Sequence, residues 1–144
     1  MLYFAYGMNT NRLGMAERCP QARALGAATL PGWRFRFAGP ADIVPDSAHQ
    51  VHGVLWDISK HCLNSLDVLE GYPYYYDRRW VTVFYNGSSA PAMTYFMQPG
   101  SQDRPPSVGY LDCVTEGYRN FGVDPQQLHQ ALALFESHNK LETV

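Results

Sequence analysis

The chain has 144 residues, the usual size of one domain and long enough to bury an apolar core. Hydrophobic residues make up 46% of the sequence and charged residues 17%, which excludes a disordered or solvating acidic protein. The net charge is −2 and no stretch clusters Lys and Arg, so the sequence also argues against a nucleic-acid partner. We therefore expect a single domain over residues 1–144.

The three cysteines, Cys19, Cys62 and Cys113, are odd in number and form no CxxC pair. Their spacing predicts neither a zinc site nor a disulfide framework, and three free thiols favour a reducing compartment. Residues 1–6 lack the basic and long apolar segments of a signal peptide, and no stretch approaches the ~20 apolar residues of a membrane span. We expect a cytoplasmic protein with no membrane partner.

The first elements in chain order are a strand and a short helix. The apolar residues 2–6 end at Gly7 and predict a buried strand followed by a tight turn. Residues 9–11 supply N-cap side chains for a helix that runs to about Arg18, and Pro20 terminates it.

The middle of the chain predicts strands separated by turn signals. Residues 22–30 form a weak strand pattern, residues 31–32 are a Pro-Gly turn signal, and residues 33–37 alternate aromatic and basic side chains as a strand does. Residues 39–49 contain two prolines and predict an ordered loop, and residues 50–58 predict another strand.

The remaining pattern favours an α+β fold without regular βαβ alternation. Ser59 can cap a helix that runs through Leu69 and ends at Gly71. The later predicted elements are strands 79–85 and 92–97 around Asn86-Gly87, a loop over 98–107, and helices 108–121 and 125–138. We expect a mixed, partly closed, barrel-like sheet with flanking helices.

One acid, Glu70, is placed to do chemistry on the helix that begins after Ser59. The apolar residues of this helix form one arc: Cys62, Leu63, Leu66 and Leu69. At about 100° per residue, Glu70 falls inside this arc, whereas Asp67 falls outside it. An acid that faces apolar surface loses hydration, so its pKa should rise toward neutrality, which suits a general acid/base. The alternative is a structural acid paired with Arg78 or Arg79.

A second candidate feature is the loop Tyr6-Gly7-Met8-Asn9 at the end of the first strand. Gly7 permits a turn with positive φ, and the helix start that follows leaves backbone N–H groups free to bind an oxyanion or carboxylate. The loop lacks the spacing of a P-loop or of GxGxxG, and an ordinary turn remains the alternative. No serine lies in a GxSxG context and no histidines have metal-ligand spacing, so the sequence offers no other nucleophile or metal centre.

Several short segments resemble one known family. They are Tyr3-Phe4-Ala5-Tyr6-Gly7-Met8-Asn9, residues 66–73, Tyr76-Asp77-Arg78, residues 94–97 and residues 106–110. The first is similar to the YGSN signature of the gamma-glutamylcyclotransferase-like (AIG2-like) family, and residues 66–73 resemble the segment around that family's catalytic glutamate. The resemblance implies a small barrel-like sheet and cyclisation of a γ-glutamyl group, which releases 5-oxoproline and an amine or amino acid without a metal or organic cofactor.

The same resemblance implies roles for individual residues. Glu70 is expected to act as the general acid/base. The backbone of Gly7, Met8 and Asn9 is expected to bind the γ-glutamyl group, with Tyr6 beside it. Tyr110 is expected to contact the ligand.

Some alternatives remain open on the sequence. Met8 stands where the family usually has serine, so the substrate can be a γ-glutamyl amine, a peptide or an acyl-metabolite. A non-catalytic binding module on the same fold and an amide hydrolase in which Glu70 activates water are the competing functions. Residues 72–76 are rich in tyrosine and suit either a substrate channel or a homodimer contact.

Overall fold

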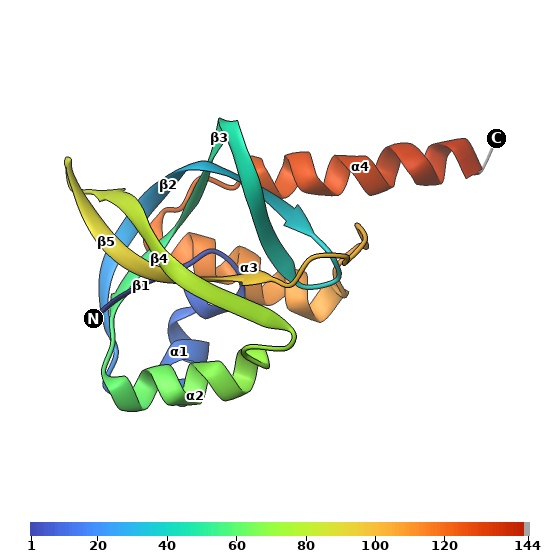
Figure 1. The fold of residues 1–144 in the computed structure, drawn as a ribbon. Helices are drawn as coiled ribbons and strands as arrows, with labels where there is room; N and C mark the ends of the chain where they lie inside the picture. The colour runs from blue at the N-terminus through green and yellow to red at the C-terminus, as the bar shows by residue number, and fades with distance from the viewer. Residues whose placement is uncertain (143–144) are drawn as a thin grey trace.

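The computed structural model describes the backbone of residues 1–142 and the side chains of residues 1–136. Five strands close into one barrel in the order β1-β3-β2-β4-β5, and the helices lie outside it (Figure 1). The strands are β1 Leu2–Ala5, β2 Arg23–Phe37, β3 Ala41–Asp57, β4 Tyr76–Tyr85 and β5 Ser88–Met97. The helices are the 3-10 turn η1 Met8–Thr10, and α1 Arg12–Arg18, α2 Lys60–Glu70, α3 Val108–Phe121 and α4 Gln126–Glu142. The α+β class with a barrel-like sheet is confirmed, and the barrel is closed.

The short strand β1 completes the barrel, because it pairs antiparallel with β3 and parallel with β5. The Oγ1 of Thr94 donates to the backbone oxygen of Phe4 at 2.9 Å, which adds a side-chain link across the β1–β5 junction. The strands of the barrel carry most of the fully buried large side chains: Phe4, Leu30, Phe37, Ile43, Val51, Val54, Leu55, Val83 and Met93.

The β2–β3 hairpin differs most from the sequence prediction. The Pro-Gly pair at residues 31–32 is not a turn between two strands, because β2 continues through it with a shift of register between Pro31 and Trp33. Gly32 has a φ of +85°, which suits the irregular position in a bulged strand. The predicted loop over 39–49 is wrong for most of its length, because β3 begins at Ala41 and residues 41–45 pair with residues 33–37.

The β4–β5 hairpin confirms the turn predicted at Asn86-Gly87. Both residues have positive φ, +54° and +81°, as a two-residue hairpin turn of this type requires. Pairing resumes at once between Tyr85 and Ser88, so β5 begins four residues before its predicted start at residue 92. Strand β4 begins at Tyr76, three residues before its predicted start.

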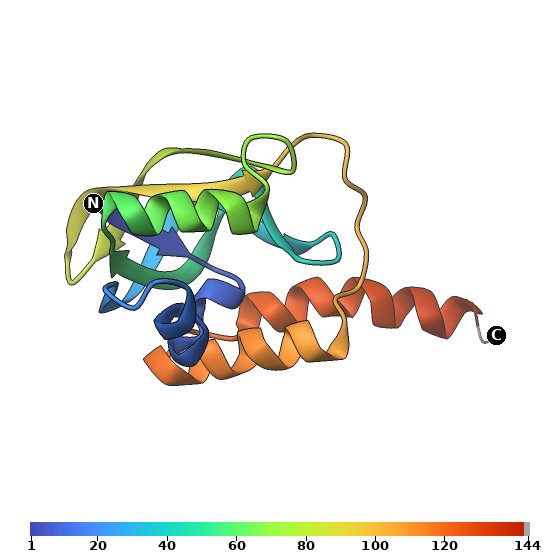
Figure 2. The same ribbon diagram turned by 90° about the horizontal axis from the view of Figure 1, so that it is seen from below.

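Helices α1 and α2 are capped where the sequence predicted, and Ser107 is a further cap. The side chains of Asn11, Ser59 and Ser107 accept hydrogen bonds from backbone N–H groups in the first turns of α1, α2 and α3. Gly71 ends α2 in the left-handed conformation, with a φ of +66°. Figures 1 and 2 show α2 along one side of the barrel with α1 and α3 nearby, while α4 runs past the end of the barrel.

The cysteines correct one prediction. Cys19, which follows α1, forms a disulfide with Cys62 in α2, and their Cα atoms are 5.3 Å apart. Cys113 is the free cysteine. The expectation of three free thiols was therefore wrong, because two residues 43 positions apart meet only in the folded chain. The cysteines therefore give no support for a reducing compartment.

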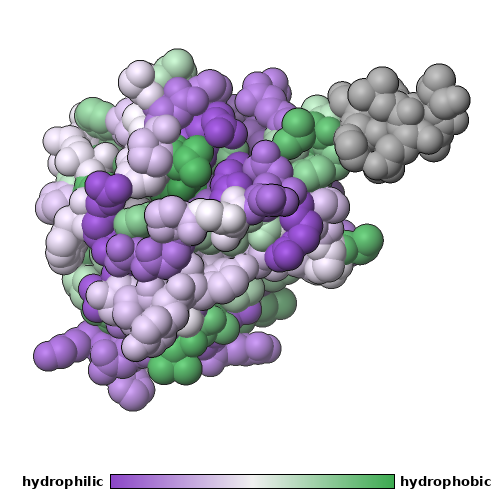
Figure 3. Space-filling view, turned by 45° about the vertical axis from the view of Figure 1, so that its right-hand side comes forward, coloured by the Kyte–Doolittle hydropathy of each residue, from purple (hydrophilic) through white to green (hydrophobic). Residues whose placement is uncertain are grey.

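The surface gives two further observations. Hydrophobic residues on the face in Figure 3 lie in separate patches among polar ones, so this face has no continuous apolar surface. Over the part of the chain that the structure describes, every helix is too short or too polar to cross a membrane.

Candidate active site

The predicted site residues meet around one cavity of about 380 Å³. It lies where the end of β1, the turn η1, the end of α2 and the start of α3 come together with β4 and β5. All six predicted residues line it: Tyr6, Gly7, Met8, Asn9, Glu70 and Tyr110. Among the described residues, Glu70 is the only charged one in the lining, and most of the remaining wall is aromatic or aliphatic. Glu70 is therefore the lining residue whose charge can change near neutral pH.

Glu70 is the last residue of α2, and the left-handed turn at Gly71 ends the helix directly after it. Burial raises the pKa of the Glu70 carboxyl to about 7, while Arg18 and the hydrogen bond from Asn9 act in the opposite direction. The sequence prediction of a raised pKa is confirmed. A carboxyl with this pKa can both take and give a proton near neutral pH.

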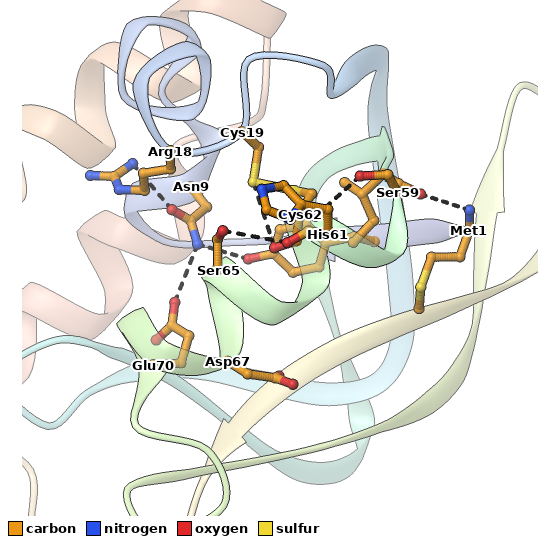
Figure 4. The surroundings of a disulfide bond; sticks show 12 residues. Met1, Asn9, Arg18, Cys19, Ser59, His61, Cys62, Ser65, Asp67 and Glu70 are labelled. Atoms are coloured by element: carbon orange, nitrogen blue, oxygen red, sulfur yellow. Dashed lines mark hydrogen bonds between the residues drawn. A yellow bond between two sulfur atoms is a disulfide. The ribbon is translucent and has the colours of Figure 1, made fainter.

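The alternative that Glu70 pairs with Arg78 or Arg79 is wrong. Arg78 instead binds Asp67, with Nε to Oδ1 at 3.0 Å and Nη2 to Oδ2 at 3.3 Å. The guanidinium of Arg79 stacks over aromatic rings, 5.0 Å from the centroid of Trp33. Figure 4 shows Glu70 pointing toward Asn9 and Asp67 pointing away from it.

Asn9 is the direct partner of Glu70 and is buried. Its Nδ2 donates to the Oε1 of Glu70 at 3.2 Å and to the Oη of Tyr3 at 3.0 Å. Its Oδ1 accepts from the Nη1 of Arg18 at 3.2 Å. The sequence suggested a role for the backbone of Asn9, and this side-chain contact was missed, because no spacing in the sequence relates residue 9 to residue 70.

The turn after β1 is built differently from the prediction. Gly7 has a φ of −112°, so the expected positive φ is wrong. Crowding explains the glycine, since a Cβ there would lie 2.8 Å from the Oη of Tyr110 and 3.1 Å from the Cβ of Ala41. The backbone oxygen of Gly7 accepts from the N–H of Thr10 at 3.1 Å and from its hydroxyl at 2.6 Å, which fixes the shape of the turn.

Tyr110 lies in the first turn of α3 and places its hydroxyl beside this loop. The backbone N–H of Ala41 donates to the Oη of Tyr110 at 3.0 Å. Burial raises the pKa of Tyr110 to about 12, and hydrogen bonds from the backbone N–H groups of Ala41 and Met8 partly offset this effect. The hydroxyl therefore stays protonated at neutral pH. Tyr6, in contrast, donates its hydroxyl to the backbone oxygen of Tyr95 at 2.7 Å, so it supports the wall.

Residues that the sequence did not single out complete the site. Tyr3, Tyr76 and Tyr95 line the cavity, and the hydroxyl of Tyr76 donates to the backbone oxygen of Ala41 at 2.7 Å. The high tyrosine content was the available signal, although it does not indicate which tyrosines share one wall. Within the described residues, no three His, Cys, Asp or Glu side chains are grouped as metal ligands would be.

The fold and site are those of a small closed mixed barrel with one buried carboxyl in a tyrosine-lined cavity, which is the kind of cavity that binds a small molecule. The chain belongs to the gamma-glutamyl cyclotransferase, AIG2-like family, whose sequence profile matches residues 3–112.

Solved structures agree with this assignment. A gamma-glutamyl cyclotransferase is 27% identical with a TM-score of 0.83, and uncharacterized protein loc79017 from Homo sapiens is 27% identical with a TM-score of 0.82. Each of these alignments covers 92% of this chain and 86% of the other. YkqA from Bacillus subtilis shares the fold at 24% identity and a TM-score of 0.77, over 95% of this chain and 54% of its own. No curated protein sequence matches the chain. The family and the similar cyclotransferase structure support a general cyclotransferase function.

Proposed function

We propose that this protein cyclises the γ-glutamyl group of a small molecule and releases 5-oxoproline together with an amine or amino acid. Glu70 is the general acid/base. The observation that supports this role most directly is that Glu70 is the only charged residue lining the cavity and has a pKa of about 7. The substrate supplies its own nucleophile, so one base is sufficient.

The reaction is balanced in protons with Glu70 alone. The α-amine of the substrate attacks its own γ-carbonyl carbon, and Glu70 takes the proton that the amine loses. The new C–N bond closes the five-membered lactam. The bond from the γ-carbonyl carbon to the leaving nitrogen then breaks, and Glu70 returns the proton to that nitrogen. A pKa near neutrality suits both transfers, since neither protonation state is strongly favoured.

The loop after β1 binds the γ-glutamyl group. The backbone N–H groups of Gly7, Met8 and Asn9 are the donors for the substrate and for the oxyanion that forms during attack. Tyr110 contributes a hydroxyl that stays protonated at neutral pH. Met8 replaces the family's serine without removing a backbone donor, so this loop can still act through its main chain.

We place the leaving group toward Val68, Leu69 and Tyr75, which also line the cavity. These side chains are partly exposed, with Val68 84% accessible, so this end of the cavity opens to solvent. The leaving group is therefore an amine, a peptide or an acyl-metabolite that extends out of the cavity.

The test is a panel of γ-glutamyl compounds assayed for 5-oxoproline with the wild type and Glu70→Gln. We expect the variant to remain folded and to bind 5-oxoproline, with turnover lost. Glu17→Gln is the matched control, because Glu17 is an exposed acid on α1 outside the cavity lining. Equal turnover by Glu70→Gln and the wild type would remove Glu70 from the mechanism.

The competing functions give different results in the same panel. Binding of a γ-glutamyl compound without turnover by the wild type would favour a non-catalytic module. In heavy-oxygen water, cyclisation yields 5-oxoproline without solvent oxygen, whereas hydrolysis by a Glu70-activated water yields glutamate that carries one.

A further inference from the structure

We propose that Arg18 is a positioning residue of this site, which fixes the side-chain amide of Asn9 and through it the carboxyl of Glu70. The proposal rests on the proposed role of Glu70 as the acid/base. Arg18 does not line the cavity, so it acts through Asn9 and not on the substrate.

The hydrogen bonds of Asn9 give the amide one orientation. The Nη1 of Arg18 donates to the Oδ1 of Asn9 at 3.2 Å, on the side of the amide opposite Glu70 (Figure 4). A guanidinium has only donors, so a rotated amide would place its NH₂ group against another donor and its oxygen against the Glu70 carboxylate. Arg18 therefore keeps the NH₂ group directed at the Oε1 of Glu70, at 3.2 Å.

The surroundings of Arg18 hold its guanidinium near Asn9. Gly14 leaves the space for it, since a Cβ at Gly14 would lie 2.6 Å from the Nη1 of Arg18. A glycine inside a helix costs about 1 kcal/mol relative to alanine, and this packing gives a physical reason for its presence in α1. The neighbouring Cys19 is bonded to Cys62, which ties the end of α1 to the helix that carries Glu70.

Arg18 is also the cation that acts on Glu70. Burial raises the pKa of five tyrosines that line the cavity on the other elements: Tyr3, Tyr6, Tyr76, Tyr95 and Tyr110. All five are neutral near pH 7. On α2 itself, Asp67 is paired with Arg78 and accepts from the Oη of Tyr95 at 2.7 Å. Arg18 is thus the charged group that opposes the effect of burial on the pKa of Glu70.

The experiment compares Arg18→Met, Arg18→Lys and Arg12→Met in the full chain. We expect Arg18→Met to lower kcat on the order of ten- to hundredfold, as misplacement of a reacting group does. The acid limb of its profile of kcat/KM against pH should move to higher pH, because the pKa of Glu70 rises when the charge of Arg18 is removed. Arg18→Lys keeps the charge but not the planar fork, so the limb should stay near the wild-type position while kcat falls. Arg12 is on the same helix with its guanidinium over the ring of Phe121, and Arg12→Met should leave the profile unchanged.

A second readout keeps the proposal separate from turnover. The pKa of the Glu70 carboxyl, followed by NMR with labelled glutamate, should rise above the wild-type value in Arg18→Met. This titration remains informative even if Glu70→Gln proves fully active, which would overturn the acid/base role and not the contact. If Arg18→Met does not fold, Gly14→Ala displaces the same guanidinium and should lower kcat in the same way. An unchanged titration and an unchanged kcat in a folded Arg18 or Gly14 variant would overturn the proposal.

Discussion

Glu70→Gln should make the protein more stable than the wild type at pH 8. Burial raises the pKa of this carboxyl from 4.5 to about 7. At about 1.4 kcal/mol per pKa unit, ionising the group in the folded chain costs about 3 kcal/mol relative to the unfolded chain. Glutamine has similar shape, carries no charge and can still accept the hydrogen bond from Asn9. The free energy of unfolding of the variant should therefore exceed that of the wild type by most of this amount, or about 3 kcal/mol.

The pH dependence follows from the sign of the shift. Below pH 4.5 the carboxyl is protonated in both the folded and the unfolded chain, so it does not lower the free energy of unfolding. Between pH 4.5 and 7 the unfolded chain ionises first, so the wild type loses stability as pH rises, and above 7 the loss is complete. We expect urea denaturation to show that the free energy of unfolding of Glu70→Gln exceeds that of the wild type. The difference should be less than about 1 kcal/mol at pH 5 and about 3 kcal/mol at pH 8.

The control for this measurement is Glu17→Gln, whose exposed side chain should change stability by less than about 0.5 kcal/mol at both pH values. An equal advantage of Glu70→Gln at pH 5 and pH 8 would refute the reasoning, because the carboxyl would then ionise alike in the folded and unfolded chains.

Two further predictions concern the scaffold. Reduction of the bond from Cys19, which closes a loop of 43 residues, should lower the free energy of unfolding by about 4 kcal/mol in urea denaturation with dithiothreitol. The control variant Cys113→Ser should lose the same free energy of unfolding on addition of dithiothreitol as the wild type. If dithiothreitol does not change the free energy of unfolding, the disulfide is absent. Gly7→Ala should weaken binding of 5-oxoproline in calorimetry at least tenfold, because the new methyl group meets the Oη of Tyr110 at 2.8 Å. Unchanged affinity in a folded variant would show that the loop has room to move.

Local signals in the sequence predicted the part of the site that lies on one helix. Ser59 and Gly71 fixed the limits of α2, and the helical period then placed Glu70 among the apolar residues. Each of these features involves residues within one or two turns of each other. The pKa of Glu70 could be predicted in direction for the same reason.

Features that depend on distant contacts could not be predicted. Gly7 reads as a residue for a positive-φ turn, but its neighbour is Tyr110, more than one hundred residues later in the chain. Residues 39–49 contain turn formers, and yet part of this segment is a strand because β2 lies beside it and supplies hydrogen-bond partners. Tertiary pairing overrides local propensity in such segments.

The two acids near the end of α2 show how placement decides function. Asp67 and Glu70 are three residues apart, but Asp67 meets Arg78 and Tyr95 at the rim, whereas Glu70 enters the cavity. A carboxylate at the C-terminal end of a helix also faces the negative end of the helix dipole, which disfavours its charge further. Burial raises the pKa of Glu70, and the opposite charge of Arg18 limits that rise. The folded chain thus gives up stability at one position, and it is the position that we propose takes and returns a proton during the reaction.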